Sequence, residues 1–171
     1  LSHAMVSSDA RAADVARRWP EHFGAERLYQ LTGHTAHPMF TLFKILWLRD
    51  EQPETWRRAR HLYCFEELLQ DRLGLEPAIS YPLAGRTMLF NVRSHTWDPD
   101  ILAAVGLEPS RLARPLPTGA VVGRLAPEAA RRINVAPGTV VTTGGHDQPC
   151  GALGAGVTAP GRAMYGMGTV E

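Results

Sequence analysis

The stretch of sequence that decides the fold is Val140-Val-Thr-Thr-Gly-Gly-His-Asp147-Gln-Pro-Cys-Gly-Ala-Leu-Gly-Ala-Gly156. Its apolar start predicts a strand over Thr139 to Thr143, its glycine pair a turn, and its small residues a helix beginning near Pro149. In open α/β proteins a turn of this kind lies at the carboxyl edge of a sheet, where ligands bind. The turn presents one carboxylate, Asp147, and the functional interpretation starts there.

Asp147 has two interpretations. The positive end of a helix dipole helps a carboxylate at a helix start to stay ionised. In a cleft, such a carboxylate can take the proton of a substrate hydroxyl as its oxygen attacks phosphorus. The commoner role of an aspartate at a helix start is structural, as a cap that accepts free backbone amides. The sequence of the turn alone leaves both interpretations open.

A second glycine turn follows at Gly166-Met-Gly168-Thr169. The backbone amides of such a turn, together with the threonine hydroxyl, can bind a phosphate, although many hairpins use similar turns. Between the two turns, residues 157 to 161 have the composition of a hinge. They predict a domain boundary, with a new strand beginning at Arg162 to Tyr165.

Upstream of these turns the sequence predicts mainly helices. Caps and apolar spacing place them at Ala10–Trp19 (ended by Pro20), Gly24–Leu31 (followed by Gly33), Thr41–Asp50, Pro53–Arg60, Phe65–Leu73, Pro99–Leu107 and Pro127–Arg132, with strands at Thr87–Val92 and Gly119–Gly123. The Thr41–Asp50 helix is expected to be amphipathic. Lys44, the only lysine, lies on or beside its apolar stripe and either reaches the surface or points into a cleft.

Composition limits the possible functions. The 171 residues are 44% hydrophobic and 20% charged, as expected for one globular domain. Eighteen basic and 17 acidic residues give a net charge of +1, which argues against a nucleic-acid partner. Two distant cysteines favour a reducing compartment, and the sequence lacks a secretory signal or a long enough apolar run for a membrane span. We expect a cytoplasmic protein without a membrane partner.

Three histidines invite a metal interpretation. His34 and His37 are three residues apart, but they lie in a proline-bounded loop without clear third and fourth ligands. Polar loop residues near a substrate fit this pattern better than zinc ligands, so no metal ligand is assigned to the chain. A metal-dependent hydrolase that uses His34, His37, His146 and Asp147 remains the second alternative function.

Several short motifs, in this order, resemble the FGGY family of carbohydrate kinases. They are Ser8-Asp9-Ala-Arg11-Ala, Leu31-Thr32-Gly33, Pro38-Met-Phe-Thr-Leu-Phe-Lys44-Ile-Leu-Trp47-Leu, Glu67-Leu-Leu-Gln-Asp-Arg-Leu-Gly74, Ala84-Gly-Arg-Thr87-Met, Trp97-Asp98, Gly119-Ala-Val-Val-Gly123, Gly144-Gly-His-Asp147-Gln148 and Gly168-Thr169. Each motif is weak alone, but the ordered set is specific and covers nearly the whole chain.

The resemblance implies an α/β fold of the ribonuclease H-like, actin-like ATPase type, present in part. Residues 1–157 correspond to the later part of the sugar-binding N-terminal domain, and residues 158–171 to the hinge and first strand of the ATP-binding domain. The family's general base falls on Asp147, and its sugar-contacting neighbour on Gln148. Its turn near the ATP phosphates falls on Gly168 and Thr169. His146 replaces a glycine that is usual in the family and is expected beside the substrate.

The implied activity is phosphorylation of a sugar or polyol hydroxyl by ATP and Mg²⁺, with a homodimer left open. The Thr32–Leu48 stretch is closer to xylulose- and gluconate-type kinases than to glycerol kinases, because Met39 stands where the latter usually have tyrosine. The family's Asp-x-Gly-Thr turn and adenosine site have no match here, so the 171 residues alone are expected to be inactive. The first alternative is a non-catalytic sugar- or partner-binding domain of kinase shape.

Overall fold

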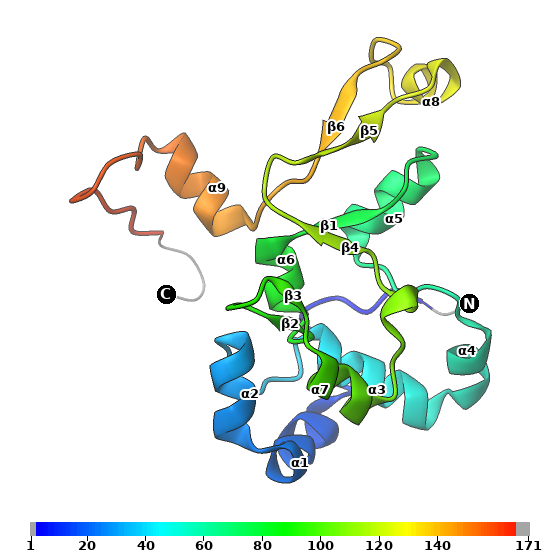
Figure 1. Cartoon of the computed structure of the whole chain (residues 1–171), viewed down its shortest axis with the longest axis vertical. Helices are drawn as coiled ribbons and strands as arrows, with labels where there is room; N and C mark the ends of the chain where they lie inside the picture. The colour runs from blue at the N-terminus through cyan, green and yellow to red at the C-terminus, as the bar shows by residue number, and fades with distance from the viewer. Residues whose placement is uncertain (1–2, 167–171) are drawn as a thin grey trace.

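Helices dominate the computed structural model, which describes residues 3–166 (Figure 1). The helices are α1 (Ala13–Phe23), α2 (Ala25–Thr32), α3 (Thr41–Glu51), α4 (Pro53–Arg58), α5 (Phe65–Arg72), α6 (Tyr81–Arg86), α7 (Pro99–Val105), the 3₁₀ turn η1 (Pro109–Arg111), α8 (Pro127–Arg132) and α9 (Asp147–Gly154). The strands are β1 (Ala78–Ser80), β2 (Phe90–Asn91), β3 (Thr96–Trp97), β4 (Arg114–Leu116), β5 (Val121–Arg124) and β6 (Val140–Thr142). None of these helices is long and apolar enough to cross a membrane.

The main core lies among the lower helices of Figure 1, around α3. Phe43 and Leu46 of α3 are fully buried against Leu28 and Ile101 from neighbouring helices. The prediction of a helix here is confirmed, but the prediction of an amphipathic one is wrong. Lys44 itself is only 8% exposed, because α1, α4 and the segment after α6 cover α3 on several sides. A helix enclosed in this way is apolar nearly all round.

Pro20 does not end the first helix, contrary to the prediction. It lies inside α1 and is buried, although a proline removes one helical hydrogen bond. Trp19 and Phe23 stack across it with ring centroids 4.8 Å apart, and Trp19 also packs edge-on against Phe43. Tertiary packing therefore keeps the chain helical beyond Pro20, and α1 ends only at Phe23, just before Gly24. The predicted glycine stops after α2 and α7 are confirmed, since Gly33 and Gly106 adopt left-handed conformations.

The strands form three short pairs. β1 and β4 are parallel, whereas β2–β3 and β5–β6 are antiparallel, with an irregularity between Val121 and Gly123. The strand predicted over Thr87–Val92 shortens to two residues because Thr87 and Met88 close a turn after α6. β5, β6 and α8 form the upper arm of Figure 1, and α9 projects to one side of it.

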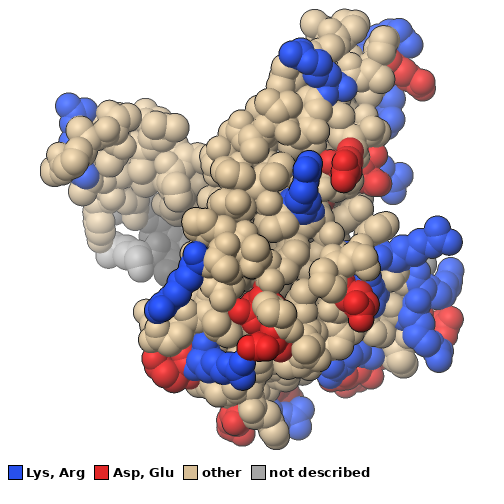
Figure 2. Space-filling view, viewed as in Figure 1, with Lys and Arg blue, Asp and Glu red and all other residues tan. Residues whose placement is uncertain are grey.

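The chain after α9 does not form the strand predicted at Arg162–Tyr165. Residues 162–166 are assigned to neither helix nor strand. Instead this segment returns toward α9, where Met164 lies near Gly151. The surface in Figure 2 mixes basic and acidic side chains over the lower helices, and the region around α9 shows mainly uncharged residues.

Candidate functional site

The residue after β6 anchors the turn that leads to Asp147. Thr143 is 2% exposed, and its hydroxyl donates to the Pro117 carbonyl at 2.6 Å and accepts the Ala120 amide at 3.1 Å. Backbone hydrogen bonds to Gly119 and Ala120 complete the anchor. The predicted strand, turn and helix are all present, and the strand end is firmly held.

Two glycines then carry the chain to the helix. The Gly144 amide donates to Glu66 Oε1 at 3.0 Å. A Cβ added to Gly145 would stand 3.1 Å from Cys150 Sγ and 3.7 Å from Thr118 Oγ1. Little room for a side chain exists at this point, because the turn folds closely over the first turn of α9.

Asp147 is the first residue of α9, two residues earlier than the predicted start near Pro149. Its side chain is 81% exposed, and Oδ1 accepts the Gln148 amide at 2.8 Å. The residue thus makes a local capping contact while Oδ2 stays available to solvent or a ligand.

His146 lies against Asp147. Its Nδ1 is 2.7 Å from Asp147 Oδ1 and 3.4 Å from the Gln148 amide. The Gln148 amide donates to Asp147 Oδ1 at 2.8 Å and makes a longer contact with the imidazole. His146 therefore orients the carboxylate oxygen that faces it.

A cavity of about 590 Å³ adjoins the turn through His146. Its walls include Met39, Phe40, Lys44, Leu83, Arg86 and Ser7. The lining contains the cationic groups of Lys44 and Arg86 and no Asp or Glu side chain. Arg86 stacks over the Phe40 ring at 4.7 Å, and within residues 3–166 it forms no ion pair with a carboxylate. A guanidinium in this setting suits an anionic or oxygen-rich ligand.

The histidines of the hydrolase alternative are not assembled as a metal site. His34 packs on Phe40 with ring centroids 4.9 Å apart, and burial, followed by the charges of Arg86 and His146, lowers its pKa. His37 Nδ1 accepts the Met39 amide at 3.2 Å. Across the part of the chain that the structure describes, no group of three or more His, Cys, Asp or Glu side chains could hold a metal ion.

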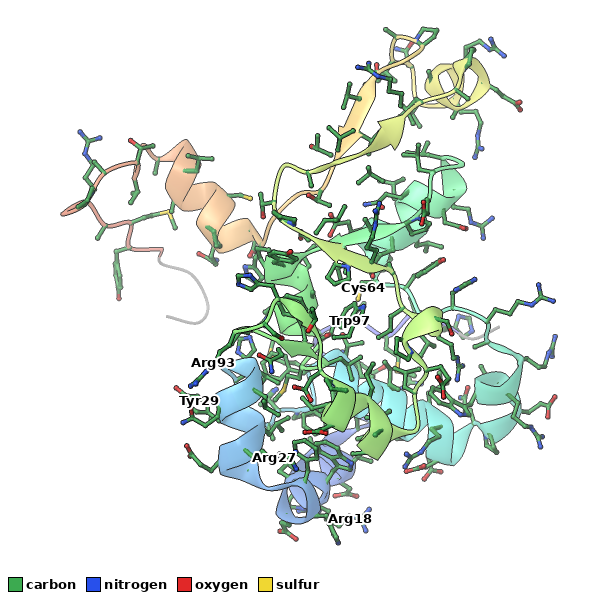
Figure 3. The ribbon with its side chains drawn as sticks, viewed as in Figure 1. Arg18, Arg27, Tyr29, Cys64, Arg93 and Trp97 are labelled. Carbon is green, nitrogen blue, oxygen red and sulfur yellow. The ribbon has the colours of Figure 1, made fainter. Side chains whose placement is uncertain are left out.

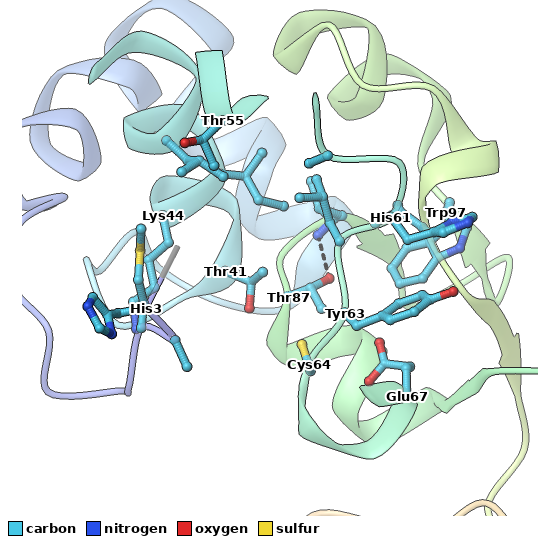
Figure 4. Close-up of a pocket in the computed structure, with 18 residues that line it drawn as sticks. His3, Thr41, Lys44, Thr55, His61, Tyr63, Cys64, Glu67, Thr87 and Trp97 are labelled. Atoms are coloured by element: carbon cyan, nitrogen blue, oxygen red, sulfur yellow. Dashed lines mark hydrogen bonds between the residues drawn. The ribbon is translucent and has the colours of Figure 1, made fainter. Parts of the chain in front are cut away.

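A second cavity of about 350 Å³ opens beside α3 (Figure 4). Lys44 and His3 lie on one side of it, and Cys64, Tyr63 and Glu67 on the other. Lys44 Nζ donates to the Val6 carbonyl, so this lysine points inward, and burial lowers its pKa. In the wider view, Cys64 and Trp97 lie between the lower helices and the β1–β4 pair (Figure 3).

Glu67 is the buried ionisable group of this second cavity. It is 3% exposed, and Oε2 has no hydrogen-bond partner. Burial raises its pKa to about 7 against the opposing effect of backbone N–H groups of Glu67 and Cys64. Burial, with the nearby Glu67 carboxyl, also raises the pKa of the Cys64 thiol to about 12, which keeps this thiol protonated and unreactive.

Gln148 and the second glycine turn complete the predicted site. Gln148 is exposed on α9, outside the lining of the larger cavity, and its Oε1 would stand 3.3 Å from a Cβ at Gly166. Gly168 and Thr169 lie outside the described residues. Sequence reasoning missed Arg86, Glu66 and Glu67 as site residues. The Ala84-Gly-Arg-Thr87 motif could have indicated Arg86 as a site residue. No feature of the sequence indicates that Glu66 contacts Gly144, which lies 78 positions later.

Comparison with known proteins gives a consistent result. Residues 1–154 match the N-terminal domain of the FGGY family of carbohydrate kinases. Gluconokinase of Bacillus licheniformis is 28% identical over 99% of this chain and 33% of its own length. Autoinducer-2 kinase of Yersinia enterocolitica is 31% identical over 97% of this chain and 32% of its own. The chain thus spans about a third of the length of these relatives.

Solved structures agree on the fold. Ligand-bound xylulose kinase from Lactobacillus acidophilus superposes with a TM-score of 0.84 at 22% identity, covering 91% of this chain and 32% of that one. Gluconate kinase from the same organism superposes with a TM-score of 0.80 at 22% identity, covering 86% of this chain and 30% of that one. The expected ribonuclease H-like fold, present in part, is confirmed.

Proposed function

Because the chain belongs to the FGGY family of carbohydrate kinases, we propose that its full-length protein transfers the γ-phosphoryl group of ATP to a sugar or polyol hydroxyl. The observation that carries the proposal is the position of Asp147. It stands exposed at the first position of α9, on an anchored glycine turn, next to His146, which lines a cavity that Lys44 and Arg86 also line. The chain supplies the carboxylate side of the site.

Asp147 acts as the general base in this proposal. Its carboxylate accepts the proton of the acceptor hydroxyl while the acceptor oxygen bonds to the γ-phosphorus of ATP. The bond from the γ-phosphorus to the β–γ bridging oxygen breaks, and ADP leaves. His146 orients the carboxylate through its Nδ1 contact. Mg²⁺ enters with ATP, and Gly168 and Thr169 remain the predicted contacts for the ATP phosphates.

The acceptor occupies the larger cavity. Arg86 faces this space without a carboxylate partner among residues 3–166, so a sugar acid is favoured over a neutral polyol. His146 contacts the acceptor from the turn, and Gln148 remains a predicted contact. The proposed partners are thus small molecules, the acceptor and Mg-ATP, within the cytoplasm.

Changing Arg86 to glutamine is expected to raise the KM for an aldonate such as gluconate by roughly 10- to 100-fold, because a charged hydrogen bond to its carboxylate is lost. The KM for ATP should stay the same. Steady-state kinetics of the full-length protein measure both values. Arg93→Gln is the matched control, since Arg93 is exposed and its guanidinium donates to Gln30, away from the lining of the larger cavity. Equal effects of the two variants would contradict the Arg86 assignment.

The kinase proposal is tested with two preparations, the full-length protein and the 171-residue chain. A thermal-shift screen of pentoses, aldonates and polyols selects the acceptor. With that acceptor and Mg-ATP, the full-length protein should release ADP, and the 171-residue chain should release none. Acceptor binding without ADP release by the full-length protein would support the non-catalytic alternative. ADP release by the short chain alone would contradict its assignment as one side of the site.

A further inference from the structure

Glu66 connects three parts of the chain that are distant in sequence. It lies in the first turn of α5 and is half-buried. Oε2 accepts the Ser80 amide at 3.1 Å and the Ser80 hydroxyl at 3.2 Å, and Oε1 accepts the Gly144 amide at 3.0 Å. One carboxylate therefore joins α5, the junction of β1 with α6, and the turn that precedes Asp147.

The fixed end of this connection is Ser80. Ser80 is fully buried and is the last residue of β1, which pairs with β4 in parallel. The Ser80 hydroxyl and amide hold Oε2, so the carboxylate plane has little freedom to rotate. Oε1 consequently presents a fixed acceptor to the turn.

The other end of this connection is the glycine pair. Gly144 and Gly145 have no side chains of their own to anchor, and glycine allows more backbone conformations than any other residue. Within residues 3–166, Glu66 makes the only side-chain hydrogen bond to either glycine. Thr143 fixes the chain before the pair, and α9 begins three residues after Gly144.

We propose that Glu66 is a positioning residue for the proposed reaction: it fixes the Gly144–Gly145 turn and thereby the place of the Asp147 carboxylate. The inference rests on the proposed role of Asp147 as general base. Glu66 is not among the residues that line the larger cavity, so its loss should change the rate of proton transfer and leave acceptor binding alone. A displacement of about 1 Å at a reacting group can cost roughly 100-fold in rate.

The test uses Glu66→Gln in the full-length protein. Glutamine offers one acceptor oxygen and places an NH₂ group against an N–H donor, so it cannot hold Ser80 and Gly144 together. We expect kcat to fall roughly 10- to 100-fold with an unchanged KM for the acceptor. Hydrogen exchange of the Gly144 amide should become faster. If this variant does not fold, Glu66→Asp can be measured in the same way, because the shorter side chain of aspartate cannot reach both Ser80 and Gly144.

Two comparisons separate positioning from mere stabilisation. Asp71→Asn removes an exposed carboxylate from the same helix and should leave kcat and Gly144 exchange unchanged. If Glu66→Gln lowers thermal stability but leaves kcat and Gly144 exchange unchanged, the inference is overturned. Asp147→Asn is measured alongside. Full activity of Asp147→Asn would reject the general base itself, whereas an inactive Asp147→Asn with a normal Glu66→Gln would reject only the role of Glu66.

Discussion

Asp147→Asn is expected to lower kcat of the full-length protein by about 10²- to 10⁴-fold, the usual contribution of a general base. Asparagine keeps the size of the side chain and can still accept the Gln148 amide, but it cannot take the proton of the acceptor hydroxyl. Folding should be unaffected because the Asp147 side chain is 81% exposed. Steady-state kinetics and a thermal unfolding curve for each protein measure the two effects.

The matched control for this experiment is Asp14→Asn. Asp14 is an exposed carboxylate in the first turn of α1 that pairs with Arg17, far along the chain from the turn. This control should keep the kcat of the parent. A near-normal kcat for Asp147→Asn would leave only the capping role for this residue, and the mechanism proposed above would be wrong.

Glu67→Gln is expected to stabilise the chain above pH 7. The folded-state pKa of Glu67 is about 7 and its unfolded reference is 4.5, so the fold favours the protonated carboxyl. The contribution of the Glu67 carboxyl to the free energy of unfolding is fully present below pH 4.5 and is lost as the pH rises through 7. The pKa difference corresponds to roughly 3 kcal/mol of unfolding free energy. Glutamine does not titrate, so the free energy of unfolding of the variant should not fall in this way as the pH rises.

Urea unfolding of the parent and the Glu67→Gln variant at several pH values between 4.5 and 8 measures this effect. The gain of the variant should be small at pH 4.5 and largest at pH 8. Glu76→Gln serves as the control, because Glu76 is exposed and should leave the pH dependence of the parent unchanged. A parent and a Glu67→Gln variant with parallel stability curves would show that the buried carboxyl does not titrate as described.

Local signals in the sequence predicted the helices well. Glycines in left-handed conformations ended α2 and α7 as expected, and Pro53 began α4. The errors came from tertiary packing, which no local signal reports. Burial of Pro20 kept α1 continuous, and enclosure of α3 buried Lys44. Residues 162–166 show no strand where one was expected to begin at Arg162.

The candidate site was predictable only in part for the same reason. The turn, its glycines and Asp147 are consecutive, so their order in the sequence already predicts their arrangement. The partners of the turn come from elsewhere. Glu66 reaches Gly144 across 78 positions, and Arg86 joins His146 in the wall of one cavity only after folding. Contacts of this range depend on the packing of α5 and α6 against the strands.

The most direct measurement of the central claim is product analysis by mass spectrometry. The full-length protein is incubated with Mg-ATP and the acceptor that gives the largest thermal shift, in parallel with its Asp147→Asn variant. The account predicts a phosphorylated acceptor together with ADP from the parent, and almost none from the variant in the same time. Equal amounts of phosphorylated acceptor from both proteins, or none from the parent, would contradict the assignment of Asp147 as the base of a sugar kinase.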